Sequence, residues 1–403
     1  MDSQSVAYLY DNSQSFHLIG LGSEACFELG PENRLDELDL FLQNHSGAHL
    51  FCCLSYDLKN RIEKLSSKHV DGIEFPEAVV WKPEVVIQFN GQDTQVLYGN
   101  LSAEQNVQWE QIQVKLSGKS GKLPSLKFKA RTDKQDYLNQ VNQIKAHIQQ
   151  GDVYEVNYCQ EYHTLVPEEF DSWELVRALG ELTQAPFSAY IRLGKHEVFC
   201  GSPERFIQKK DSRLISQPIK GTIARGKNEE EDILLRKQLM NDPKERAENI
   251  MITDLVRNDF SRIAAKNSVQ VDELCACYSF GTVHQLISTV SCSLRDKITF
   301  SEILKATFPM GSMTGAPKIS AMKLIEKTED FSRGIYSGSI GYFDPKGNFD
   351  FNVVIRSLVL NRETNYLSCA VGGAITIQSE AEKEYQECQA KVSKIMNLLG
   401  GDQ

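Results

Sequence analysis

The chain has 403 residues, of which 41 % are hydrophobic and 24 % charged, a composition typical of a soluble globular protein with one large or two ordinary domains. Its formal net charge of −10 argues against a nucleic-acid partner, because phosphate binding needs a basic surface. No apolar run approaches the roughly 20 residues of a membrane span, and residues 1–5 lack the basic and apolar regions of a signal peptide, so no membrane partner is expected.

Strand-like segments come first in the chain. Residues 78–81 and 85–89 are rich in Val, Ile and aromatic residues, which predicts two strands. A Gly, Ser and Lys-rich stretch at 116–124 predicts an exposed connection. We therefore divide the chain into an N-terminal part of the fold, residues 1–124, and a catalytic domain, residues 125–403.

Two helix starts follow this connection. A helix is expected from Thr132 or Asp133, because apolar residues recur at helical spacing and Gly151 offers a stop. A second helix is expected at 241–243, where a capping residue precedes a proline in the first turn. Residues 189–192 and 197–200 predict short strands between them.

The last part of the chain predicts two strands and a helix. Residues 349–360 and 367–377 are rich in Val, Ile and Phe. Ser379 and Glu382 have the spacing of a capping box, so the final helix should begin there. Strands and helices without regular alternation favour the α+β class.

The ten cysteines have no C-x-x-C spacing, and the tightest pairs are too close for a zinc ribbon. They are expected to be reduced thiols of a cytoplasmic protein.

Two pairs of glutamates lie on predicted helices. Glu245 and Glu248 are three residues apart, as are Glu384 and Glu387, so each pair projects from one helical face. Mg²⁺ prefers oxygen ligands, and two such pairs meeting from different helices would suit one ion. The alternative is that Glu245 caps its helix and the other three are solvated.

Two cations stand near these glutamates or in an apolar strand. Lys391 follows Glu387 by four residues, so it either forms a surface ion pair or faces a substrate carboxylate. Arg356 lies in a strand expected to be buried, and a buried guanidinium needs a carboxylate partner, internal or from a ligand. The nearby Gly372 and Gly373 would allow close approach of a ligand or form a simple bulge.

Lys220 lies between Pro218 and Gly221, with Glu204 sixteen residues upstream. This arrangement is plausible for a lysine that takes part in chemistry. His284 alone is more typical of a structural histidine. Residues 311–318 are rich in small and hydroxylated side chains and could bind an anion, although they lack the P-loop pattern.

Six motifs, in this order, resemble those of the chorismate-binding enzymes, which include anthranilate synthase component I, aminodeoxychorismate synthase component I, isochorismate synthase and salicylate synthase. The motifs occupy residues 202–206, 218–222, 245–249, 254–259, 314–318 and 384–387. The resemblance covers about residues 125–400, and more loosely residues 55–59. It implies an anthranilate synthase component I-like α+β fold with two large antiparallel β-sheets, helices packed outside and the active site between.

The resemblance also implies the residues of the site. Mg²⁺ would join the ring carboxylate of chorismate to Glu248 and Glu387, with Glu245 and Glu384 behind them or acting through water. His284 would position the ring carboxylate. The residues expected to bind the substrate are Arg356, Tyr336, Lys391, Gly372, Gly373, Thr222 and Thr314.

Within the family, lysine at position 220 resembles the aminodeoxychorismate synthases, whereas anthranilate and isochorismate synthases have a small residue there. The implied reaction uses chorismate and ammonia to make 4-amino-4-deoxychorismate for p-aminobenzoate and folate. Lys220 would attack C2 and Glu204 would act as general acid for the departing C4 hydroxyl. A nucleophilic lysine must be neutral, so we expect the pKa of Lys220 to be lowered by burial and by Arg356 or Lys391.

Glu155 departs from the family pattern, since aminodeoxychorismate synthases usually have Gln there and the water-using members have Lys. It argues against a water nucleophile, and would orient ammonium, accept a proton or only accept a hydrogen bond. The chain lacks the nucleophile elbow of a glutaminase, so the resemblance implies a separate glutamine amidotransferase subunit. The alternatives are anthranilate synthase component I and a non-catalytic chorismate-binding homologue.

Overall fold

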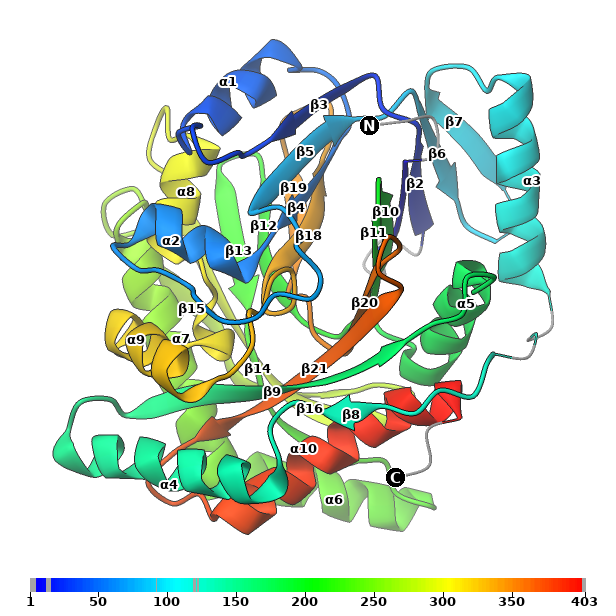
Figure 1. The fold of residues 1–403 in the computed structure, drawn as a ribbon. Coiled ribbons are helices and arrows are strands. Elements are labelled where there is room, and N and C mark those ends of the chain that lie inside the picture. The colour runs from blue at the N-terminus through cyan, green and yellow to red at the C-terminus, as the bar shows by residue number, and fades with distance from the viewer. Residues whose placement is uncertain (1–4, 12–15, 92, 119–120, 122, 401–403) are drawn as a thin grey trace.

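Two large antiparallel sheets, of 11 and 10 strands, form the centre of this computed structural model (Figure 1). It describes residues 5–11, 16–91, 93–118, 121 and 123–400. Sheet 1 contains, in order across the sheet, β17 (Gly315–Ala316), β9 (Glu155–Leu165), β21 (Tyr366–Ile375), β20 (Ser357–Asn361), β11 (His196–Ser202), β10 (Phe187–Leu193), β1 (Val6–Asp11), β2 (Phe16–Leu21), β6 (Val85–Phe89) and β7 (Thr94–Tyr98), with β8 (Lys129–Ala130) beside β9. Sheet 2 contains β14 (Ile219–Ala224), β16 (Val283–Ser293), β13 (Arg213–Gln217), β12 (Arg205–Lys210), β19 (Phe349–Asn352), β18 (Ser339–Phe343), β4 (Leu50–Leu54), β5 (Ala78–Lys82) and β3 (Ala25–Glu28), with β15 (Gln270–Ser279) beside β16.

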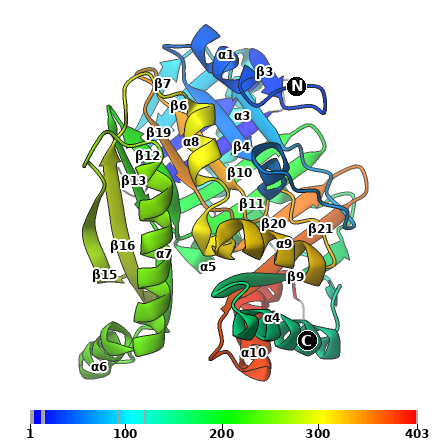
Figure 2. The same cartoon turned by 90° about the vertical axis from the view of Figure 1, so that its left-hand side faces the viewer.

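Helices pack on the outside of these sheets, as the fold class requires. They are α1 (Glu37–Asn44), α2 (Lys59–Ile62), α3 (Ala103–Ser117), α4 (Lys134–Gln150), α5 (Ser172–Thr183), α6 (Glu229–Asn241), α7 (Pro243–Ser261), α8 (Phe300–Thr307), α9 (Lys318–Thr328) and α10 (Ala381–Met396), with short 3₁₀ turns η1 (Tyr56–Leu58), η2 (Gly311–Met313) and η3 (Asn397–Leu399). Figure 2 shows α6 and α7 beside β15 and β16 on one side of the molecule, and α4 and α10 beneath β9 and β21 on the other. The predicted α+β class with two antiparallel sheets is confirmed.

Strands from the first 124 residues lie in both sheets. β1 pairs with β10 in sheet 1, and β4 pairs with β18 in sheet 2. The boundary at 124 therefore divides the sequence but not the sheets. Of the predicted connection at 116–124, α3 takes the first two residues, and residues 119, 120 and 122 lie outside the described part.

The local signals at the two predicted helix starts are confirmed. The Asp133 side chain accepts a hydrogen bond from the backbone N–H of Asp136, and Gly151 ends α4 with a φ of 86°. The Asp242 side chain caps α7, with Pro243 in the first turn. The strands predicted near residues 78–89, 189–200 and 367–377 also form.

Two predictions near the C-terminus are wrong. Residues 349–360 form two strands in different sheets, because the chain crosses between the sheets at 353–356 and Arg356 has a φ of 51°. Ser379 does not cap the last helix: its hydroxyl accepts a hydrogen bond from the Thr376 N–H, and the helix begins at Ala381. The Ser379 hydroxyl is therefore used in the turn before the helix, and not as the helix cap that the capping-box spacing predicted.

All ten cysteines are free thiols, and Cys26 is the exposed one. Within the described ranges, no helix combines the length and apolar character that crossing a bilayer demands.

Candidate active site

An ion pair joins the two sheets where their edges approach. Lys220 Nζ on β14 donates to Glu155 Oε1 on β9 at 3.0 Å. The Glu155 carboxylate is fully buried and the Lys220 side chain is 11 % exposed. Helix α7 packs on β14, and α10 packs on β21 beside β9. Each helix thus brings its pair of glutamates toward this ion pair.

A bulge in β14 presents Lys220. Ile219 pairs with Ile287 and Thr222 with Gln285, so β14 has one residue more than β16 between these pairs. Gly221 takes a φ of 89°, which favours glycine. A Cβ on Gly221 would lie 3.1 Å from the Cβ of Glu245, so glycine also permits close approach of α7.

The electrostatics of Lys220 differ from the expectation. Burial lowers the pKa of Lys220, but Glu155 and Glu248 more than offset it, and the net pKa is raised. The prediction of a lowered pKa is therefore wrong for the ligand-free site. The expectation did not include the attraction between the Lys220 ammonium and the carboxylates of Glu155, Glu248 and Glu204.

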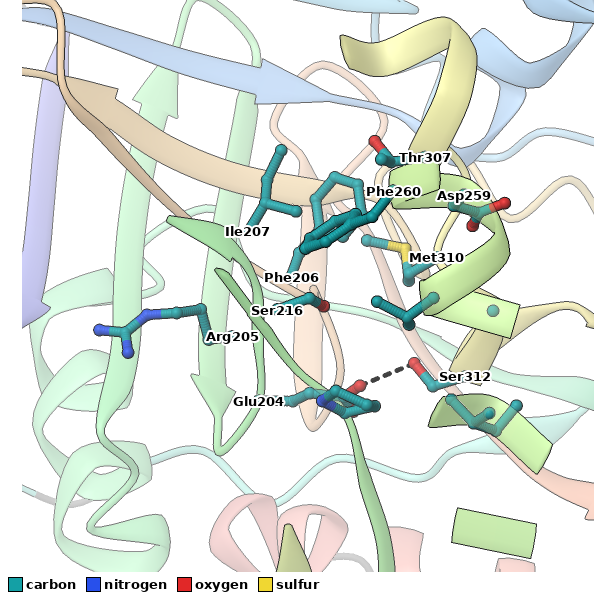
Figure 3. Close-up of a pocket in the computed structure, with 14 residues that line it drawn as sticks. Glu204, Arg205, Phe206, Ile207, Ser216, Asp259, Phe260, Thr307, Met310 and Ser312 are labelled. Atoms are coloured by element: carbon teal, nitrogen blue, oxygen red, sulfur yellow. Dashed lines mark hydrogen bonds between the residues drawn. The ribbon is translucent and has the colours of Figure 1, made fainter. Parts of the chain in front are cut away.

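Glu204 lies between β11 and β12 and is 5 % exposed. Its Oε1 accepts a hydrogen bond from the Ser312 hydroxyl at 2.7 Å (Figure 3). Burial raises the pKa of Glu204 to about 7, although Ser312, Lys220, the Ile219 N–H and Arg356 each oppose the rise. A carboxyl with this pKa can donate a proton near neutral pH.

A small cavity borders Glu204 and Ser312, walled by the apolar side chains of Phe206, Phe260 and Met310 (Figure 3). Its volume of about 20 Å³ is roughly that of one water. The apolar walls help to explain why the Glu204 carboxyl is so poorly solvated.

The two glutamate pairs face each other across a lysine. Lys244 Nζ lies 3.8 Å from Glu248 Oε1 and 3.6 Å from Glu384 Oε1, and so links α7 to α10. The remaining glutamate of each pair is also close to the other helix, because Glu245 and Glu387 interact electrostatically with each other. Among the residues described, no three or more His, Cys, Asp or Glu side chains are already gathered as a metal site.

The donor set nevertheless fits a hard cation. Glu248 Oε1 is buried and accepts no hydrogen bond from any described residue, and the same holds for Glu155 Oε2. Burial raises the pKa of Glu248 to about 7, which reflects a carboxylate without enough positive charge around it. Buried carboxylate oxygens that accept no hydrogen bond are what a site for Mg²⁺ would offer.

Several predicted substrate-binding groups lie next to this cluster. Lys391 Nζ contacts Glu387 Oε1 at 2.7 Å and donates to the Gly372 carbonyl at 3.1 Å. A Cβ on Gly373 would lie 3.4 Å from Glu384 Oε2, so the backbone of β21 at this glycine lies close to the Glu384 carboxylate. Burial lowers the pKa of Arg356, which Glu204 opposes.

Four predicted residues have protein partners instead. The ring nitrogens of His284 lie 3.0 Å from Asp232 Oδ1 and 2.8 Å from the Ser279 hydroxyl. The Tyr336 hydroxyl is 3.9 Å from Cys159 Sγ. Thr314 donates to the Met310 and Gly311 carbonyls, and Thr222 accepts from Gln285 Nε2 at 3.4 Å. Their assignment to the substrate remains a prediction.

Sequence reasoning missed three residues of the site. Ser312 donates to Glu204, Lys244 lies between the glutamate pairs, and Gln285 on β16 donates to Thr222 on β14. Lys244 precedes Glu248 by four residues, and this spacing was the one available signal for its contact. Ser312 lies 108 residues from Glu204, so only folding reveals that pair.

Comparisons with known proteins identify relatives of the chain in sequence and in fold. A family model described as chorismate binding enzyme matches residues 5–397. The chain is 37 % identical over 345 residues to aminodeoxychorismate synthase component 1 of Klebsiella aerogenes, covering 85 % of this chain and 75 % of the relative. It is 34 % identical to an anthranilate synthase component I-like protein of Synechocystis, covering 86 % and 72 %. The crystal structure of anthranilate synthase component I from Streptococcus pneumoniae matches with a TM-score of 0.81 at 25 % identity, covering 95 % and 92 %.

Proposed function

This chain belongs to the family of chorismate-binding enzymes, and we propose that it is an aminodeoxychorismate synthase component that converts chorismate and ammonia to 4-amino-4-deoxychorismate. The observation that carries the proposal is the buried Lys220 on its bulge, within electrostatic reach of Glu204 and paired with Glu155. The similarity to aminodeoxychorismate synthases of Klebsiella aerogenes and Escherichia coli supports it.

The reaction exchanges a hydroxyl for an amine at the same carbon in two displacements. The Lys220 amine forms a bond to C2, the two conjugated double bonds of the ring both shift, and the C4–O bond breaks. Glu204 gives its proton to the departing hydroxyl, which leaves as water. Ammonia then forms a bond to C4, both double bonds shift back, and the C2–N bond to Lys220 breaks.

Lys220 must lose a proton before the first step, and Glu155 is placed to take it. The two side chains already share a hydrogen bond of 3.0 Å in a water-poor site. Transfer of one proton along this bond gives a neutral amine and a neutral carboxyl, so the net charge of the pair stays at zero and no unpaired charge is left buried. The raised pKa of Lys220 is thus compatible with attack, provided that Glu155 accepts the proton.

The glutamates of α7 and α10 would hold Mg²⁺, with Glu248 and Glu387 as direct ligands and Glu245 and Glu384 behind them. The ion would supply positive charge for the ring carboxylate of chorismate. Lys391, Arg356 and the backbone at Gly373 would hold the substrate carboxylates. These groups orient C2 toward Lys220 and C4 toward Glu204.

Ammonia would come from a separate glutamine amidotransferase subunit. Several relatives are named aminodeoxychorismate synthase component 1, and this name supports the existence of a second component. The Glu155 oxygen that accepts no hydrogen bond would receive ammonium beside Lys220.

The test is product identification with the purified protein, chorismate, Mg²⁺ and ammonium. The proposal expects 4-amino-4-deoxychorismate, which a separate lyase converts to p-aminobenzoate. Release of anthranilate and pyruvate would instead support anthranilate synthase, the alternative that the match to the Streptococcus pneumoniae enzyme favours. Binding of chorismate without turnover would indicate a non-catalytic homologue.

A further inference from the structure

Lys244 occupies a position where a lysine is unfavourable for its own helix. It is the second residue of α7, next to the Asp242 cap and Pro243. The N-terminus of a helix carries partial positive charge, so a cation there is repelled. The position therefore has to be stabilised by something other than the helix.

The compensation comes from the glutamates of both helices. The Lys244 ammonium is attracted by Glu384, Glu248, Glu245 and Glu387, which are the four carboxylates assigned to the metal. It lies between the two helices at 3.6–3.8 Å, close enough for attraction but too far for a direct hydrogen bond. Lys391 differs, because it is held on Glu387 at 2.7 Å and on the Gly372 carbonyl.

Its side chain can also leave. The Lys244 side chain is 38 % exposed, whereas those of Glu248 and Glu384 are 11 % and 5 % exposed. A flexible four-carbon stem can turn toward solvent without moving the helix. The buried carboxylates have no such freedom.

From these contacts we propose that Lys244 is a resident counter-cation that competes with Mg²⁺ for the glutamates of α7 and α10. Without metal, its ammonium keeps the two helices together against the repulsion of their carboxylates. With metal, the ammonium withdraws to solvent. This inference rests on the Mg²⁺ site of the proposed function, and not on which product the enzyme makes.

The test measures metal binding rather than turnover. Lys244→Gln should bind Mg²⁺ about ten-fold more tightly in calorimetry on the metal-free full chain, because a nearby positive charge no longer opposes the ion. Its metal-free Tm should fall by about 2 °C, and saturating Mg²⁺ should restore it to the parent value.

Two variants control for general effects of the substitution. Lys244→Arg keeps the charge and should bind Mg²⁺ as the parent does. Lys237→Gln removes the same charge from an exposed position on α6 and should change neither quantity. Equal or weaker Mg²⁺ binding by Lys244→Gln would overturn the inference, since damage to a site weakens binding whereas removal of a competitor tightens it.

A parent protein that binds no Mg²⁺ would overturn both this inference and the metal site. The product assay would still stand, because it identifies the compound formed and not the metal bound.

Discussion

The pKa values of Lys220 and Glu204 are both raised, but for different reasons. Lys220 is surrounded by carboxylates, which raise its pKa above the ordinary value of a lysine. Glu204 lies against apolar walls and holds its proton up to a pH of about 7. The neighbours of the two groups therefore favour the charged form of Lys220 and the neutral form of Glu204.

Replacing Lys220 by alanine should abolish the product. Without the amine there is no bond to C2, and we expect ammonium-dependent turnover to fall by at least about 1000-fold. Intact-mass measurement of the parent during turnover should reveal an adduct that Lys220→Ala lacks. Lys227→Ala, which removes an exposed lysine whose backbone N–H alone is bonded to Glu231, serves as the control. Product formation by Lys220→Ala at the parent rate would refute the nucleophile.

Glu204→Gln should lose activity but gain stability at alkaline pH. The pKa of Glu204 in the folded protein, about 7, lies above the 4.5 of an ordinary glutamate, so the folded parent binds the extra proton and becomes less stable as pH rises from about 4.5 to 7. Glutamine cannot ionise and avoids this cost, which is on the order of 1–3 kcal/mol at pH 8. Urea unfolding at pH 5 and pH 8 measures the difference. A variant no more stable than the parent at pH 8 would contradict this account of Glu204.

At the scale of elements, the bulge in β14 determines the direction in which Lys220 points. The extra residue turns Lys220 toward Glu155, and Gly221 lets α7 lie against the strand. The crossing at 353–356 has a similar effect on Arg356, whose left-handed backbone lies between β19 of sheet 2 and β20 of sheet 1. Irregular backbone at these two points sets the positions of Lys220 and Arg356, the side chains proposed to react with the substrate and to bind it.

Gly221→Ala should therefore harm activity more than stability alone explains. A residue with a Cβ is strained at a φ of 89°, and this Cβ would also press on Glu245. We expect a loss of roughly 1–2 kcal/mol in stability and at least about a ten-fold loss in kcat/KM.

Gly347→Ala is the matched control, because Gly347 has a φ of 75° with nothing within 4 Å of its Cβ position. It should lose similar stability and keep full activity. Equal activity losses in the two variants would show that backbone strain, and not the approach of α7, explains the effect.

At the scale of the whole molecule, the N-terminal part of the chain is bonded to the segment at residues 332–334. Asp57 near the N-terminus accepts hydrogen bonds from the Ser332 hydroxyl at 2.9 Å and from the Gly334 N–H at 3.1 Å. Arg333, between them, stacks on Tyr56 at 4.5 Å and donates to the Asn157 carbonyl at 2.8 Å. The motif at residues 55–59 thus supports β9, the strand that carries Glu155.

A fragment of residues 125–403 should not fold on its own. Loss of β1 and β4 would expose the edges of β10 and β18. It would also uncover buried residues such as Ile191 and Ile340, which lie in one core cluster with Phe51 and Trp81 of the removed part. We expect aggregation or loss of cooperative unfolding by circular dichroism, whereas the full chain should unfold in one transition. A soluble, cooperatively folded fragment would show that the boundary at 124 separates a true domain.

The sequence by itself determined the class of the fold, the caps of α4 and α7 and the family to which the chain belongs, because these depend on periodicity, local hydrogen bonds and ordered motifs. It did not determine the break at Arg356 or the cap of α10, where a turn competes with a regular pattern. Only the tertiary structure decided the direction in which the pKa of Lys220 is shifted, the hydrogen bond from Ser312 to Glu204 and the place of Lys244. Burial and electrostatic attraction depend on distances between residues far apart in the chain, and only the folded chain sets those distances.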